Sequence, residues 1–328
     1  MKFTSLFALP FLLLGCISTL AQALEIVYPA DKTYVVNSDF LIIKGGDKPP
    51  LDAMTVEIDG AKSDPIDISG ADYRAAFKDF LILQPSLDPG KNLVKVEGFA
   101  QGKRVATVQA DIFYAPRQED IVPAGYQPFV MHLPAREALC SSCHLMNPTR
   151  EQLNDPAPTA NPCAACHRRM LERKYVHGPA GVFRCAYCHQ PESKPNRYQD
   201  RGGDAALCNE CHLDKVKEFQ TNRFVHGPVA VGLCSVCHNP HASDYPAQLV
   251  APINDLCLGC HEAVSRDIHV VRGVSGQGHP LKGIPDPSNA GRELSCTSCH
   301  DPHGGSVNTF FQRGITDRFS LCQLCHAK

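Results

Sequence analysis

Sixteen of the 17 cysteines fall into eight motifs in which two cysteines flank two other residues and a histidine follows at once. Two thiols at this spacing can each add to one vinyl group along a single porphyrin edge, and the histidine then lies beneath the iron. The pattern predicts eight covalent c-type haems. The cysteines are Cys140, Cys143, Cys163, Cys166, Cys185, Cys188, Cys208, Cys211, Cys234, Cys237, Cys257, Cys260, Cys296, Cys299, Cys322 and Cys325, and the proximal histidines are His144, His167, His189, His212, His238, His261, His300 and His326.

Two other cysteine chemistries compete with this interpretation. Zinc ribbons also use cysteines separated by two residues, and secreted proteins use cysteines as disulfide frameworks. Neither explains why every second cysteine of the eight motifs is followed by histidine. The covalent haem prediction is therefore favoured.

Seven of the 15 histidines lie outside the motifs, and all seven lie in the same part of the chain as the motifs. A single histidine is more often a satisfied polar residue than a ligand. Here the exclusive placement favours a role as distal iron ligand, and two imidazoles on one iron favour simple one-electron exchange. These candidates are His132, His177, His226, His241, His269, His279 and His303.

The motifs form four successive pairs. Within a pair, the first cysteines of the two motifs lie 23 residues apart in the first three pairs and 26 apart in the fourth, and a histidine shortly before a proline precedes each pair. The segment 132–328 resembles the doubled CXXCH family of multihaem cytochromes. The resemblance implies that the histidine ahead of a pair, and a second histidine three residues after its first motif, act as distal ligands.

Seven distal histidines cannot serve eight irons within one chain. Pairs three and four carry both family positions, whereas pair two has Glu192 at the second position and pair one has no histidine there. His269 lies outside the repeat and is a candidate for one of these two gaps. Met146, Met170, an open position and a neighbouring subunit are the alternatives for the remaining iron, and Met ligation would raise its potential.

The N-terminal part of the chain carries no haem motif. Residues 24–115 contain neither cysteine nor histidine, and they alternate short β-rich runs with turn signals such as Asp59-Gly60. We expect strands over 25–28, 40–44, 54–58, 77–83, 93–100 and 104–114. The spacing predicts an all-β sandwich, and Ile26-Val-Tyr-Pro29 with Leu87-Asp-Pro-Gly-Lys-Asn-Leu-Val94 resembles bacterial immunoglobulin-like modules.

A linker over 116–131 is expected between this module and the octahaem region 132–328. About 197 residues for eight haems leave the haems to form most of the core in that region. We therefore expect short helices, long loops and little sheet there.

Residues 1–23 have the pattern of a signal peptide, with Lys2, an apolar run and a small-residue cleavage site. Alternatively, Cys16 ends a lipobox and anchors the protein to a membrane as an outer-membrane lipoprotein. No later segment is apolar for long enough to span a bilayer. The net charge of −2 with dispersed basic residues gives no indication of nucleic-acid binding.

Together these features predict an electron carrier rather than an enzyme. It would pass electrons between redox partners such as other cytochromes, an outer-membrane conduit or a terminal reductase, in the periplasm or outside the cell. A multihaem reductase with one open haem is one alternative. The other is a self-assembling subunit of a cytochrome filament.

Overall fold

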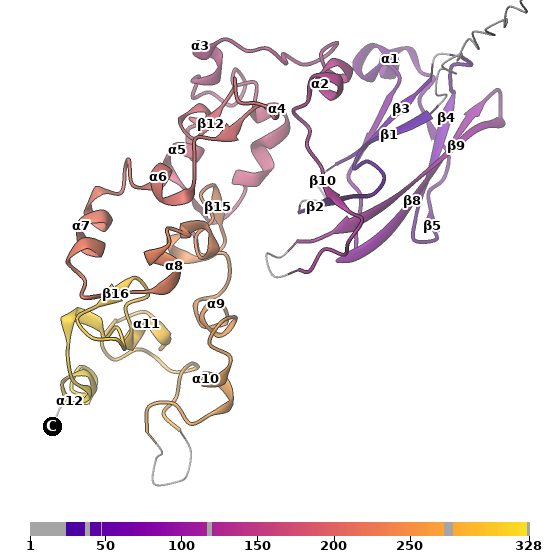
Figure 1. Cartoon of the computed structure of the whole chain (residues 1–328). Helices are drawn as coiled ribbons and strands as arrows, with labels where there is room; N and C mark the ends of the chain where they lie inside the picture. Colours follow the sequence, from indigo (N-terminus) through magenta and orange to yellow (C-terminus); the bar gives the residue numbers. More distant parts are fainter. Residues whose placement is uncertain (1–23, 37–39, 47, 117–119, 272–277, 327–328) are drawn as a thin grey trace, which may run out of the picture. The chain divides into compact units, whose positions relative to one another are not determined.

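The structure is a computed structural model that describes all residues except 1–23, 37–39, 47, 117–119, 272–277 and 327–328. The predicted signal peptide and Cys16 therefore lie outside the described residues. The chain divides into two units, Met1–Val130 and Met131–Lys328. Strands dominate the first unit, and short helices joined by loops dominate the second (Figure 1). A sheet-rich first part and a second part with little sheet are thus confirmed.

The strands of the first unit form two sheets. Three strands pair antiparallel in the order β1-β3-β7, and the larger sheet runs β10-β2-β9-β8-β4-β5, with β6 also paired to β4. The strands are β1 (Leu24–Tyr28), β2 (Thr33–Val35), β3 (Leu41–Gly45), β4 (Ala53–Ile58), β5 (Ala61–Lys62), β6 (Ile66–Asp67), β7 (Phe80–Leu83), β8 (Gly90–Ala100), β9 (Lys103–Tyr114) and β10 (Gln127–Pro128).

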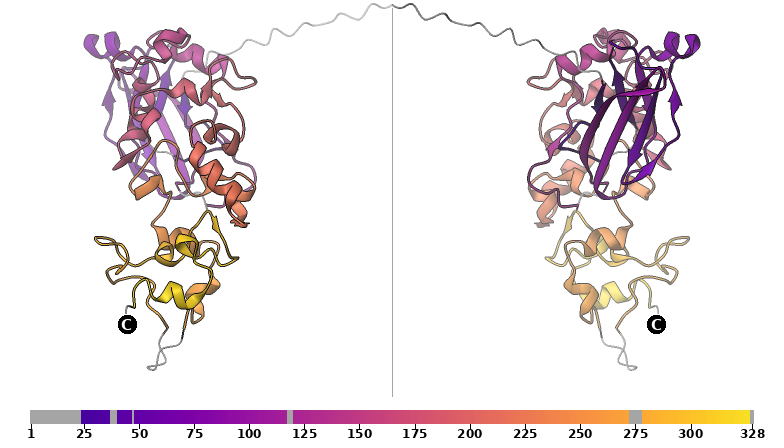
Figure 2. Two further views of the ribbon diagram at one scale, coloured as in Figure 1. Left: turned by 90° about the vertical axis from the view of Figure 1, so that its left-hand side faces the viewer. Right: turned by 90° about the vertical axis from the view of Figure 1, so that its right-hand side faces the viewer.

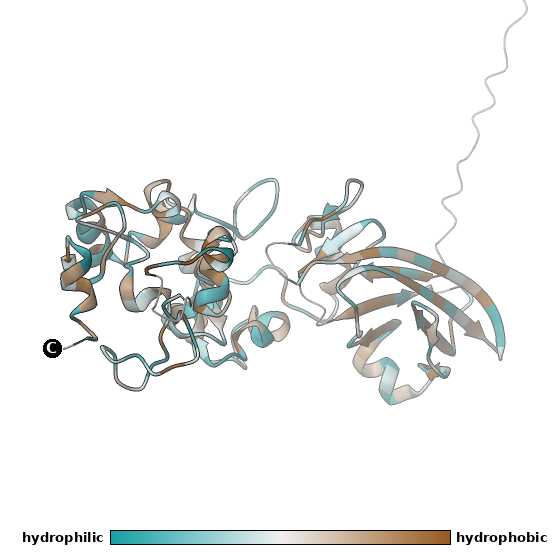
Figure 3. Cartoon of the chain, turned by 90° about the horizontal axis from the view of Figure 1, so that it is seen from below, coloured by the Kyte–Doolittle hydropathy of each residue, from teal (hydrophilic) through white to brown (hydrophobic). Residues whose placement is uncertain are grey.

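One apolar core lies between the two sheets. Val94 and Ile112 from the larger sheet are fully buried, as is Ile43 from the smaller one, and all three belong to one hydrophobic cluster. Hydrophilic and hydrophobic residues alternate along the long strands of this unit (Figure 3). This period of two buries one face of each strand, which is why these sequences form paired sheets.

Several elements differ from the sequence-based expectation. The short strands β2, β5, β6 and β10 were not expected, and the run predicted as a strand over 77–83 begins as the end of helix α1 (Ala71–Phe77). Lys78 has a φ of 56° and ends the helix, so that only Phe80–Leu83 extend as β7. The alanine-rich sequence before Phe77 favours a helix, and the apolar run alone did not reveal that boundary.

The expected turn at Asp59-Gly60 joins β4 to β5. Asp59 has a φ of 47° and Gly60 a φ of 89°, the pair of left-handed conformations that a tight two-residue hairpin requires. A Cβ at Gly60 would have no steric neighbour, so the backbone conformation is what favours glycine there.

Residues after β9 return to the first unit. In β10, Gln127 and Pro128 pair in parallel with Thr33 and Tyr34 of β2. Phe129 packs edge-on against Tyr28 with ring centroids 4.8 Å apart. Residues 127–129, within the stretch expected as a linker, are therefore part of this unit's sheet and core.

Two carboxylates on the larger sheet are held by cations. The side chain of Glu97 accepts hydrogen bonds from Lys62 and Arg104, which lower the pKa of Glu97 to about 2. Burial by itself would raise the pKa of Asp111, but hydrogen bonds from Lys32 and other neighbours outweigh it and lower that pKa to about 2.

Within the described residues of the second unit, the strands form three two-stranded pairs: β11 (Tyr175–Val176) with β15 (Ala242–Ser243), β12 (His189–Gln190) with β13 (Gln199–Asp200), and β14 (Phe224–Val225) with β16 (Gly304–Gly305). Figure 2 shows the short helices between loops. They are α2 (Pro134–Cys140), α3 (Arg150–Leu153), α4 (Ala164–His167), α5 (Gly178–Gly181), α6 (Asp204–Cys208), α7 (Leu213–Thr221), α8 (Gly227–Ala230), α9 (Ile253–Leu258), α10 (Ala263–Arg266), α11 (Cys296–Cys299) and α12 (Arg318–Cys322), with 3-10 helices η1 (Arg168–Leu171), η2 (Cys185–Tyr187), η3 (Cys234–Val236), η4 (Pro246–Gln248) and η5 (Gln312–Gly314).

Protein side chains alone give this second unit almost no apolar core. Its buried hydrophobic residues, among those described, are Leu153, Ala164, Phe183, Ala242, Leu294 and Phe311. A chain of this length normally buries far more apolar surface. Across the described part of the chain, no helix has the length and apolar character needed to cross a membrane.

Candidate haem sites

The eight motifs lie on the short helices of the second unit and on the turns that end them. The motif histidine in most cases follows one helical turn, as where the His144 N–H donates to the Cys140 carbonyl at 2.9 Å. The same bond joins His212 to Cys208 and His326 to Cys322. This turn brings the histidine and both cysteines of a motif to one side of the backbone, as covalent attachment of one porphyrin requires.

Each of the seven remaining histidines faces a different motif histidine, with ring centroids 6.0–6.2 Å apart. Two imidazoles that bind one metal through their nitrogens, at about 2.0–2.1 Å each, have centroids about 6 Å apart. The spacing therefore fits one iron between each pair. The pairs are His132 with His167, His177 with His212, His189 with His241, His226 with His261, His238 with His303, His269 with His300, and His279 with His326.

Hydrogen bonds select the tautomer in six of these histidines. The Nδ1 atom of each lies 2.6–2.9 Å from a backbone carbonyl oxygen. Since a carbonyl only accepts, Nδ1 carries the proton and Nε2 keeps a free lone pair, which is the state a metal ligand needs. They are His177, His189, His226, His238, His279 and His300.

Burial favours the neutral form of three distal candidates. It lowers the pKa of His241 to about 4, with further lowering by the nearby His189. Burial is also the largest cause of the lowered pKa of His303 and of His269. A neutral imidazole is the form that binds a metal.

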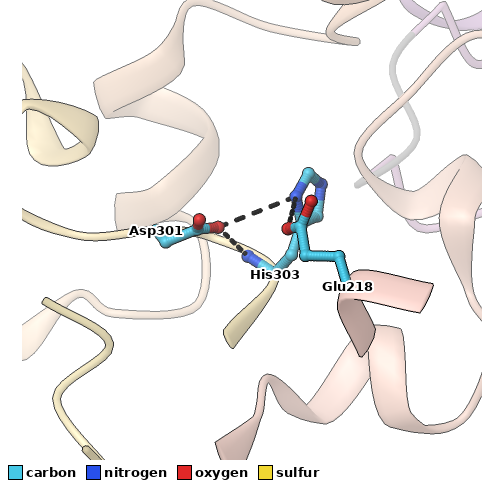
Figure 4. Close-up of side chains that lie close together, drawn as sticks. All are labelled: Glu218, Asp301 and His303. Carbon is cyan, nitrogen blue, oxygen red and sulfur yellow. Dashed lines mark hydrogen bonds and ion pairs between the residues drawn. The ribbon is translucent and has the colours of Figure 1, made fainter. Parts of the chain in front are cut away.

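Carboxylates replace carbonyls at two distal histidines. The Nδ1 atom of His132 lies 3.0 Å from Glu137 Oε1, and Arg197 donates to the other oxygen of Glu137 at 2.8 Å. At His303, Nδ1 lies 3.8 Å from Glu218 and 3.7 Å from Asp301 (Figure 4). Such partners make an imidazole ligand more basic.

Glu218, Asp301 and His303 also meet the spacing of a separate metal site, since one ligand atom of each lies within 4.8 Å of the others. His303 already faces His238, so we assign the two carboxylates to orienting this imidazole. Sequence reasoning missed Glu218, Glu137 and Arg197, because nothing in their local sequence marks them. Asp301 lies in His300-Asp-Pro-His303, so the motif context was a usable signal.

The cysteine sulfurs of consecutive motifs lie near one another. Cys163 donates to Cys185, which raises the pKa of Cys163 and lowers that of Cys185 to about 7. The same relation holds between Cys257 and Cys296, whose pKa is also lowered to about 7. The remaining steps bring Cys140 near Cys166, Cys188 near Cys211, Cys208 near Cys234, Cys237 near Cys260, and Cys299 near Cys325.

The structure pairs some histidines differently from the sequence-based expectation. His269 was a candidate for a gap in pair one or pair two, and it lies instead opposite His300 of pair four. The gap expected at the first motif of pair two is filled, because His241 of the next pair lies opposite His189. His144 alone of the 15 histidines, all within the described residues, takes no part in these pairs.

Three segments match the family model for the doubled CXXCH motif, at residues 177–217, 226–266 and 287–328. They span less than half of the chain. Doubled motifs of this kind indicate covalently bound c-type haem, and they support a multihaem c-type cytochrome with electron transfer as its function. Such a cytochrome has redox partners.

A comparison with curated proteins gave no match. Among solved structures, fibronectin(III)-like modules of Clostridium thermocellum CbhA are 15% identical, with a TM-score of 0.20 over 28% of this chain and 95% of that one. A calcium-binding mutant of Bacteroides uniformis beta-glucuronidase 2 is 11% identical, with a TM-score of 0.19 over 33% of this chain and 16% of that one. Scores this low carry no argument about the fold.

Proposed function

We propose that the chain carries eight covalent c-type haems in an unbroken row and passes single electrons along it between redox partners. Haem supplies one-electron exchange between ferric and ferrous iron. The seven histidine pairs at 6.0–6.2 Å carry this proposal, because two imidazoles on an iron exclude substrate and leave electron exchange as its chemistry.

The neighbouring cysteines support the row. At each of the seven steps a cysteine of one motif is close enough to a cysteine of the next to influence its pKa. Each sulfur would join a porphyrin edge, so the haems follow one another in the order of the sequence. In the proposed row the haems also take the place of the missing apolar core.

The proposed haem ligands are those named from the sequence, with a proximal histidine in each motif and seven distal histidines. We further propose export to the periplasm or beyond, supported by the signal-peptide pattern of 1–23. The N-terminal unit would be an immunoglobulin-like module that docks or spaces the haem-bearing unit.

A reductase is the second candidate, and it needs an iron with one free axial position. The specific observation in its favour is that His144 faces no second histidine. Intact mass of the matured protein tests the proposal as a whole. We expect the processed polypeptide plus eight haem masses, and a load of four or fewer in a fully matured sample would refute the eight-haem row.

A further inference from the structure

The distal ligand of the first haem in a pair comes from the following pair. His241 of pair three faces His189 of pair two, and His303 of pair four faces His238 of pair three. Each donor is the third residue after the first motif of its own pair. Each of these two histidines therefore serves the first haem of the preceding pair, so that the distal ligands are offset by one repeat from the haems.

A short turn presents these two ligands. The backbone N–H of His241 donates to Asn239 Oδ1 at 2.9 Å, and that of His303 donates to Asp301 Oδ1 at 2.9 Å. The carbonyl of His241 then accepts from the N–H of His177, the distal candidate opposite His212. The turn His-Asn/Asp-Pro-His thus positions its own last histidine and, through the carbonyl of that residue, the histidine ahead of the previous pair.

The same offset applied to pair one points to Glu192. Pair two reads His189-Gln190-Pro191-Glu192, so a glutamate stands where the ligand to the first haem is due, and its side chain is exposed. The turn is altered as well. The Gln190 carbonyl accepts from Tyr198 N–H at 2.7 Å, and β12 pairs with β13 over two residue pairs, where pairs three and four have only a single antiparallel bridge, His238 with Leu249 and His300 with Phe311.

Arg197 holds this altered loop against the residues after the first motif. Its side chain donates to the Pro191 carbonyl at 3.1 Å and to the Met146 carbonyl at 2.9 Å. Its backbone N–H donates to the His132 carbonyl at 3.3 Å. These bonds fix the loop that would have to deliver a ligand to the first haem.

Pair four uses a different device. Its first motif histidine, His300, faces His269 from the loop before that pair. The haem at His144 has no such substitute among the histidines. Met146 accepts a hydrogen bond from Arg197 through its carbonyl, and Met170 lies in η1, which follows His167 of the second motif directly.

We propose that the haem attached at Cys140 and Cys143 binds a small exogenous molecule at the axial position opposite His144. Glu192 stands at the sequence position from which His241 and His303 close this axial position in the preceding pairs. This inference rests on the proposed haem loading and names the site at which a reductase substrate, or any small nitrogen, carbon or sulfur donor, would bind. The other seven irons are closed by histidine.

The test uses the matured full-length protein titrated with imidazole and with cyanide. Electron paramagnetic resonance should show one high-spin ferric haem in eight, and each ligand should convert it to low spin at one equivalent per chain. Eight low-spin haems in dilute monomer would overturn the proposal. Loss of the high-spin signal only on self-association would assign the ligand to a second copy and would also overturn it.

Two variants locate the site. Q190N/E192H rebuilds the His-Asn-Pro-His turn of pair three in pair two, and it should remove the high-spin signal and the ligand binding. As matched control, H269A should add a second high-spin haem that binds imidazole in the same way. Retained binding in Q190N/E192H with unchanged haem content would overturn the assignment to this axial position. An intact mass that corresponds to fewer than eight haems would instead count against the proposed eight-haem row.

Discussion

The rings of His189 and His241 lie 6.0 Å apart, centroid to centroid, and only 7° from parallel, although they belong to different repeats. Pair two thereby depends on pair three for a ligand, and pair three depends on pair four in the same way. Ligation would tie successive repeats together through metal bonds as well as through the short β11–β15 and β14–β16 pairings.

Replacing His241 tests this dependence. In H241A we expect haem 3, attached at Cys185 and Cys188, to change from low spin to high spin, because its distal imidazole is lost. H241M should remain low spin with a potential raised by on the order of 0.1 V, a fraction of the ~0.8 V range that axial ligands span. Paramagnetic resonance and a redox titration measure both effects. A spin change at the haem attached at Cys234 and Cys237 instead would show that His241 serves its own pair, and it would contradict the offset by one repeat.

Glu137 is predicted to set the reduction potential of the haem at the second motif, whose iron would lie between His132 and His167. Its carboxylate lies 3.0 Å from Nδ1 of His132, and a negative partner stabilises the ferric state by making the ligand more basic. Glu137→Gln should raise that potential by roughly 60 mV, the equivalent of a tenfold change in a one-electron equilibrium. Spectroelectrochemistry gives the shift. Glu151→Gln, on the exposed surface of α3, is the control and should leave every potential in place.

The haem at the last motif should have a distinct spectrum. The rings of His279 and His326 are 85° apart, nearly perpendicular, whereas those of His189 and His241 are nearly parallel. Perpendicular imidazoles leave two iron d orbitals almost equal in energy, so we expect one strongly axial low-spin signal among rhombic ones. H279A should abolish that signal and H177A should not. Persistence of the axial signal in H279A would assign it to another haem.

The first unit should lose stability in acid. The pKa values of Glu97 and Asp111 are lowered to about 2, against about 4 in an unfolded chain. Their contribution is therefore complete above about pH 4 and is lost as the pH falls from there toward 2. Thermal unfolding of residues 24–130 at pH 7, 4 and 2 measures it, and cooperative transitions are expected at the two higher values.

Two variants of the same fragment separate Glu97 from general acid effects. Glu97→Gln should lower the melting temperature at pH 7 and reduce the further loss between pH 4 and 2. Asp72→Asn, on the exposed face of α1, should follow the parent. Equal pH dependence in Glu97→Gln and its parent would show that this ion cluster does not stabilise the sheet.

The motifs themselves could be recognised from the sequence, because covalent attachment needs only two thiols and a histidine within five residues. Strand periodicity likewise predicted β8 and β9, since alternation along one chain determines which face is buried. The boundary at Lys78 and the strand β2 escaped prediction. Three residues of β2 carry too little pattern, and their pairing with β9 and β10 is what makes them a strand.

The distal partners were decided by tertiary structure. The sequence by itself determined that seven further histidines accompany eight CXXCH motifs, because that is a count of residues. It could not determine which iron each histidine meets, since His241 and His269 reach partners through contacts between separate loops. Only the folded chain brings Arg197 to Glu137 and Met146, and with them positions the loop that leaves His144 without a histidine opposite.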